Sequence, residues 1–155
     1  MTELIDNSGK TRKLGATQAR HSLLQHFMIS ILIASTILLL TTKEDLFKTK
    51  YPKKVIPNIY FLPAILLTFL NPQSLGLSIT VLVTGIIANR KLDFGMADTF
   101  ALTTIALTGY GPDAVIAGLT GLYISDKTVY RTKENFPGLP GITLGFLIYI
   151  TTEII

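Results

Sequence analysis

Long apolar runs, separated by short polar segments, make up most of the chain after a polar beginning. An apolar run of about 20 residues can cross the hydrocarbon core of a membrane as a helix. The pattern therefore predicts an all-α, polytopic membrane protein built as a bundle of about six transmembrane helices. The expected helices cover residues 23–40, 55–70, 75–88, about 95–110, 114–125 and 139–155.

The chain has room for one domain. We expect residues 1–22 to form a polar N-terminal tail and residues 23–155 to form the six-helix domain. Several runs hold only about 14 residues, roughly 21 Å of helix against a hydrocarbon core of about 30 Å, so helices must extend into the loops or the bilayer must thin. Pro63 lies within the second run and predicts a kink or a late helix start there.

Composition supports a membrane setting and excludes several kinds of site. Charged residues are 15% of the chain, well below the roughly 25% of soluble domains, and hydrophobic residues reach 48%. The absence of cysteine excludes disulfides, thiolate metal sites and a cysteine nucleophile. His21 and His26 have no other ligand types nearby, so we expect no metal site, and no cofactor or nucleic acid partner.

Basic residues gather in alternate loops. The loops after the first, third and fifth runs contain all the lysines and arginines that follow the N-terminal tail, whereas the turns at residues 71–74 and 111–113 contain none. By the positive-inside rule those three loops face the cytoplasm and the N-terminus lies outside. The tail is itself basic, so either it is translocated despite its charge or the first run does not fully cross. The loop residues concerned are Lys43, Lys48, Lys50, Lys53, Lys54, Arg90, Lys91, Lys127, Arg131 and Lys133.

Two acids stand at the expected cytoplasmic boundary. Asp98 opens the fourth apolar run and Asp45 follows the first. An ionisable side chain at the threshold of a membrane span is a functional hypothesis in itself. Two carboxylates brought together could share one proton and activate water for attack on a peptide carbonyl. The simpler alternatives are that Asp98 caps its helix and that Asp45 is a solvated loop acid.

Three stretches of the chain read as motifs: residues 56–63 (IPNIYFLP), 95–98 (GMAD) and 137–145 (PGLPGITLG). They resemble motifs of the intramembrane aspartic peptidases of the prepilin peptidase family, and the second has the Gly-x-Ala-Asp form of archaeal prepilin and pre-archaellin peptidases. The resemblance implies that Asp98 and Asp45 are catalytic. It also implies supporting roles for other motif positions, namely Gly95, Ala97, Pro57, Asn58, Pro140 and Gly145.

The resemblance implies an archaeal-type hydrolase of type IV pilus or archaellum precursors. Such an enzyme cleaves the leader peptide of pilin-like or archaellin precursors at the cytoplasmic membrane face and needs no cofactor. Its partners would be the precursor and membrane lipid, and it would reside in the cell membrane as a multi-pass protein. Whether the chain forms a homo-oligomer stays open.

One departure from the family keeps other functions open. Lys50 stands where the family places its first catalytic aspartate, so Asp45 can serve only if the linker holds an insertion, which loops tolerate at small cost. Without it the chain would be a non-catalytic, peptidase-like subunit that binds pilin-like helices or stabilises a membrane assembly. A small transporter or channel is a third hypothesis. It would have to use the few polar residues of the third and fifth runs: Ser78, Thr80, Thr84 and Thr120.

Small residues four apart in the last two runs predict close packing of helices there. Ala117 and Gly121 lie on one face of the fifth run, and Gly141 and Gly145 on one face of the sixth. Small residues at this spacing let helix backbones approach closely in membranes. We therefore expect packing rather than chemistry from them.

Overall fold

The computed structural model describes residues 25–43, 56–92, 95–128 and 138–154, and within these ranges the protein is all-helical. The expectation of an all-α fold is confirmed. The helices are an N-terminal helix at Gln25–Lys43, α2 at Ile56–Leu70, α3 at Leu75–Leu92, α4 at Met96–Ala106, α5 at Pro112–Thr128 and α6 at Leu139–Ile154, with a short 3-10 helix, η1, at Pro72–Ser74.

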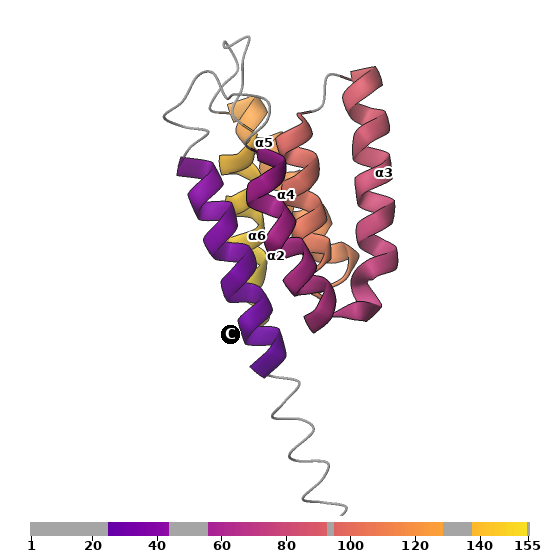
Figure 1. Ribbon diagram of the computed structural model, residues 1–155. Coiled ribbons are helices and arrows are strands. Elements are labelled where there is room, and N and C mark those ends of the chain that lie inside the picture. Colours follow the sequence, from indigo (N-terminus) through magenta and orange to yellow (C-terminus); the bar gives the residue numbers. More distant parts are fainter. Residues whose placement is uncertain (1–24, 44–55, 93–94, 129–137, 155) are drawn as a thin grey trace, which may run out of the picture.

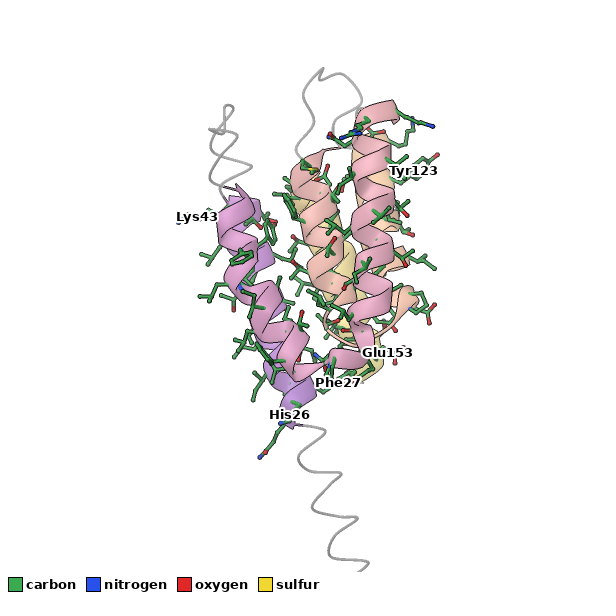
Figure 2. All side chains as sticks on the ribbon, turned by 45° about the vertical axis from the view of Figure 1, so that its right-hand side comes forward. His26, Phe27, Lys43, Tyr123 and Glu153 are labelled. Carbon is green, nitrogen blue, oxygen red and sulfur yellow. The ribbon has the colours of Figure 1, made fainter. Side chains whose placement is uncertain are left out.

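Successive helices run in alternating directions, so the bundle has two distinct ends (Figure 1). One end holds the last turns of the N-terminal helix, α3 and α5, and we call it the basic end. All lysines and arginines of the described residues lie there: Lys43, Arg90, Lys91 and Lys127. Asp113 and Glu153 lie at the opposite end, and Figure 2 shows Lys43 and Glu153 far apart along the bundle. The described basic residues therefore gather at one end of the bundle, as the loop sequences predict.

The shortest of the full helices, α4, is also the most enclosed. It contacts α2, α3, α5 and α6, and the side chains of Ala101 and Ile105 are fully buried in the core. Its buried threonines are satisfied within the helix: Thr104 Oγ1, for example, donates to the carbonyl of Phe100 at 2.8 Å. A buried hydroxyl that bonds the preceding turn leaves no unpaired polar group in an apolar core.

Glycines bring α5 and α6 into direct backbone contact. A methyl group added at Gly121 would overlap the carbonyl oxygen of Gly141 and lie 2.9 Å from the backbone nitrogen of Gly145. One added at Gly145 would in turn overlap the carbonyl oxygen of Ala117. The prediction that these four small residues serve close helix packing is confirmed, and the structure adds that the two helices are each other's partners.

A buried hydrogen-bond network closes the end opposite to the basic end. The Nδ2 atom of Asn71, which precedes η1, donates to Ser30 Oγ at 2.8 Å and to the Leu107 carbonyl at 3.2 Å. Ser74 Oγ donates to the same carbonyl at 3.2 Å and to the Asn71 carbonyl at 2.7 Å. These bonds join the N-terminal helix, the turn after α2 and the end of α4.

Two helices are longer than the sequence predicts, and one is shorter. The third and fifth helices extend beyond their apolar runs, to 18 and 17 residues, as their short runs required. The fourth ends early, at Ala106, and the turn that follows uses positive φ angles of 88° at Gly109 and 82° at Gly111. Pro63 lies inside α2, which begins at Ile56, so the expected late start is wrong.

By length and composition, two helical stretches are long and apolar enough to cross a membrane. They are Gln25–Lys43 and Pro72–Lys91. Tyr60–Leu70 and Leu139–Glu153 are apolar but shorter.

Candidate functional site

Asp98 lies in the first turn of α4, at the basic end of the bundle. Gly95 precedes the helix in an extended conformation, and its carbonyl accepts the amide of Thr99 at 3.1 Å. The half-buried Asp98 side chain folds back over this helix start, because a methyl group added at Gly95 would collide with Oδ2 and lie 3.1 Å from Cγ. This first-turn position also suits the simpler interpretation as a helix-capping acid.

The start of α6 lies against the other side of the Asp98 carboxylate. Gly138, which is buried, directly precedes α6, and a methyl group added there would lie 2.5 Å from Oδ1 and 2.7 Å from Oδ2 of Asp98. Asp98 is thus held between the beginnings of two helices. Helix N-termini carry unpaired amide groups and a partial positive charge, which makes this a suitable place for a carboxylate. We call Gly95, Asp98 and Gly138 the Asp98 seat.

Hydrogen bonds between side-chain hydroxyl groups join the helix ends at the basic end of the bundle. Tyr60 OH donates to Thr41 Oγ1 at 2.9 Å, and the Tyr60 ring stacks on Phe100 of α4 with ring centres 6.0 Å apart. Thr42 and Thr143 share a hydrogen bond of 2.7 Å. The last turn of the N-terminal helix is therefore joined to α2 and α6. The chain continues from that turn towards Asp45, which itself lies outside the described residues.

The other motif positions have different surroundings. Pro57 and Asn58 belong to the first turn of α2, and their side chains lie outside the described part of the chain. Ala97 is half-buried against the core, and Pro140 lies in the first turn of α6. Gly145 contacts Ala117 and so serves helix packing rather than the Asp98 seat.

Gly138 is the seat residue that sequence reasoning did not single out. It stands in the motif at residues 137–145, directly before a predicted helix, but nothing in one sequence indicates which distant side chain it faces. Its position directly before a predicted helix, inside a stretch that resembles a family motif, is the signal that could have drawn attention to it.

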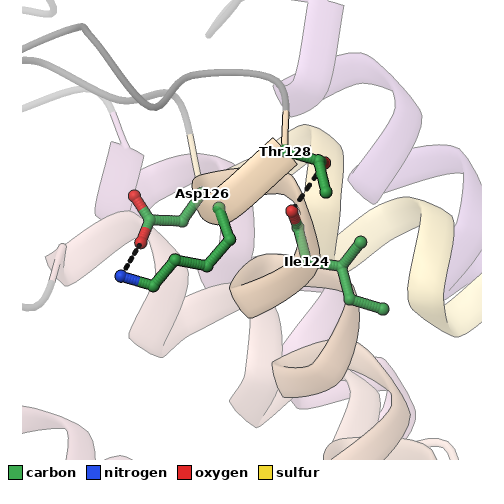
Figure 3. Close-up of polar contacts among 4 residues, drawn as sticks. Ile124, Asp126 and Thr128 are labelled. Carbon is green, nitrogen blue, oxygen red and sulfur yellow. Dashed lines mark hydrogen bonds and ion pairs between the residues drawn. The ribbon is translucent and has the colours of Figure 1, made fainter.

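The charged side chains at the end of α5 are exposed at the surface of the bundle. Asp126 and Lys127 form an ion pair at 3.8 Å near the end of α5, with side chains 49% and 62% exposed (Figure 3). Exposed pairs of this kind contribute little free energy. Among the described residues no group of histidine and acidic side chains could hold a metal ion.

An apolar hollow of about 230 Å³ lies between α3, α4 and α5 and reaches Thr99, the residue after Asp98. Gly85 of α3 lies opposite, where a methyl group would overlap the Thr99 side chain. The hollow therefore begins at the residue next to Asp98 and includes none of the three seat residues themselves. Comparisons of the chain with protein-family models, curated proteins and solved structures gave no match.

Proposed function

We propose that the protein is an intramembrane aspartic endopeptidase that removes the leader peptide of pilin-like or archaellin precursors at the cytoplasmic membrane face. The observation that carries the proposal is the half-buried Asp98 carboxylate, held between the starts of α4 and α6 in an otherwise apolar bundle. An ionisable side chain within a membrane-spanning bundle is rare and is a functional hypothesis by default, and the two helix starts lower the free-energy cost of keeping this carboxylate there.

The outer surface of the bundle favours lipid as its surroundings. Large apolar side chains stand outward from the N-terminal helix and α2, among them Leu32 at 69% exposed, Leu62 at 73% and Phe69 at 80%. Exposed apolar area of this extent is unfavourable in water. In the proposed arrangement all six helices lie in the membrane. The 11-residue α4, about 17 Å long, is shielded from lipid by its neighbours, so its ends need not reach the bilayer surface.

The distribution of charge supports the orientation. Lys43, Arg90, Lys91 and Lys127 gather at the end that holds the Asp98 seat. Basic residues are enriched on the cytoplasmic side of membrane proteins. The proposed enzyme therefore meets its substrate at the inner leaflet.

Asp45 is the proposed partner acid. It follows the last described residue of the N-terminal helix, Lys43, by two positions, and the bonds of Thr41 and Thr42 hold that helix end beside α2 and α6. With both carboxylates at one site, one would hold a proton and the other would accept a proton from the attacking water. The protonated acid would lend its proton to the carbonyl oxygen, and as the peptide C–N bond breaks, the acid that took the proton from water would give it to the departing amine nitrogen.

The polar helix starts at the Asp98 seat and the apolar hollow beside Thr99 together suit the proposed substrate. A pilin-like precursor has a short basic leader followed by an apolar helix, and the bond to be cut lies at their junction. Apolar side chains after that junction fit the hollow beside Thr99, while the leader would remain on the polar, cytoplasmic side.

Cleavage of a co-expressed precursor tests the proposal. The unaltered protein should shorten a precursor made of a basic leader and an apolar helix, and both Asp98→Asn and Asp45→Asn should abolish the shortened product. Asp113→Asn is the matched control, because Asp113 is also a first-turn acid but lies exposed at the opposite end. Unchanged processing by Asp98→Asn would exclude the aspartic peptidase function.

The second candidate function, a non-catalytic subunit that binds pilin-like helices, is favoured by Lys50, which occupies the family's expected position for the first aspartate. It predicts that the precursor co-purifies uncut with the protein. It also predicts that Asp98→Asn leaves this association unchanged.

A further inference from the structure

The glycine at position 138 is not required by the backbone. Within the described residues, only Gly109 and Gly111 adopt positive φ angles, the region that favours glycine over other residues. Alanine could therefore adopt the backbone conformation of Gly138 without strain. Space, rather than flexibility, must explain why the residue before α6 lacks a side chain.

The space at Gly138 is occupied by the Asp98 carboxylate. A methyl group at this position would lie 2.5, 2.7 and 2.8 Å from Oδ1, Oδ2 and Cγ. All three atoms belong to the far end of one side chain and none to the backbone. At Gly121, by contrast, the atoms met by a methyl group are the backbone of Gly141 and Gly145.

These two kinds of contact predict different responses. A carboxylate can swing away from an added methyl group by rotation about its side-chain bonds. Two helix backbones in contact can separate only by moving the helices, which disturbs packing along their whole length. A methyl group at position 138 should therefore move the acid and leave the fold intact.

We infer that Gly138 is a positioning residue, which leaves the start of α6 bare so that the Asp98 carboxylate stays between the two helix starts in the orientation that hydrolysis needs. The inference rests on the proposed peptidase function for its catalytic meaning. Gly138 itself touches no substrate in this role and acts only through Asp98.

Kinetics of precursor cleavage provide the first test. Displacement of a reacting group by about 1 Å can cost about a hundredfold in rate, so Gly138→Ala should lower kcat by that order and leave KM unchanged. Gly76→Ala is the matched control, because Gly76 is a helical glycine with no neighbour within 4 Å, and its kinetics should equal those of the unaltered protein. An unchanged kcat in Gly138→Ala would overturn the inference.

Thermal unfolding separates positioning from a general structural role. Gly138→Ala should unfold at nearly the temperature of the unaltered protein, whereas Gly121→Ala should unfold at a clearly lower one. A Gly138→Ala protein that fails to fold would also contradict the inference, because the methyl group would then press on the backbone rather than on the carboxylate.

Infrared spectroscopy tests the seat without a substrate. The carboxyl band of Asp98 can be assigned as the one lost in Asp98→Asn, and it should change frequency in Gly138→Ala but not in Gly76→Ala. If the unaltered protein cleaves no precursor and the band still shifts, the proposed function fails while the placement of Asp98 by Gly138 stands. If the protein cleaves and the band does not shift, the inference fails and the peptidase function stands.

Discussion

Replacement of Asn71 by leucine should destabilise the protein by an amount that its hydrogen bonds define. Asn71 is 2% exposed, and leucine fills a similar volume without the two bonds that Nδ2 donates to Ser30 Oγ and the Leu107 carbonyl. A neutral hydrogen bond contributes about 1 kcal/mol net, so the two together give a loss of about 2 kcal/mol. In a protein of this size that loss lowers Tm by roughly 4 to 8 °C.

A second substitution tests the reasoning more sharply than the loss itself. After Asn71→Leu the Leu107 carbonyl still accepts the bond from Ser74 Oγ, and after Ser74→Ala it still accepts the one from Asn71. Only the double variant removes both described donors from this carbonyl. Leaving a buried acceptor unpaired costs about 1 to 3 kcal/mol, so the double variant should lose more stability than the two single losses added together.

The assay is thermal unfolding in detergent, followed by circular dichroism, of the two single variants, the double variant and Gln73→Leu. Gln73 is exposed in the same turn, so its replacement should leave Tm nearly unchanged. Strictly additive losses would refute the idea that the Leu107 carbonyl is shared. A loss at Gln73 equal to that at Asn71 would refute the assignment of the effect to the buried bonds.

Two further predictions address the basic end and the orientation. Tyr60→Phe keeps the ring stacked on Phe100 but loses the hydrogen bond to Thr41, so thermal unfolding should show a loss of stability of about 1 kcal/mol. The control Tyr123→Phe changes an exposed ring and should leave stability unchanged. Equal losses in the two variants would contradict the role of the Tyr60 hydrogen bond. Because the chain has no cysteine, Asp113→Cys and Lys91→Cys can each carry the sole thiol. In intact cells a membrane-impermeant maleimide should label Asp113→Cys but not Lys91→Cys until the cells are permeabilised, and the reverse pattern would invert the proposed orientation.

Helix positions could be predicted from the sequence because apolar runs of this length have few alternatives. The ends were harder to place where turn geometry decides them. The fourth helix was expected to continue to about residue 110, but Gly109 and Gly111 turn the chain and α4 ends at Ala106. Close packing at α5 and at α6 was predictable, because small residues four apart leave no side chain to hold backbones apart, but the sequence did not indicate that these two helices pack against each other.

The buried polar network could not be predicted in the same way. The segment around Asn71 was expected to be an uncharged turn, and η1 confirms a tight turn there. The partner of its side chain, Ser30, is 41 residues away in the chain. A single sequence indicates that a turn is polar, but the fold decides which of its polar side chains points inward.

A single sequence also does not indicate that Asp98 becomes half-buried, and a comparison of Asp98 with Asp113 shows why. Both are acids in the first turn of a helix, so local rules for helix starts treat them alike. Asp113 is exposed at the end opposite to the basic end, whereas Asp98 is half-buried because α4 is short and enclosed and Gly138, at the start of α6, lies against it. What distinguishes a helix cap from a candidate catalytic acid is therefore the approach of a second helix start, from 40 residues further along the chain, with a glycine at the point of contact.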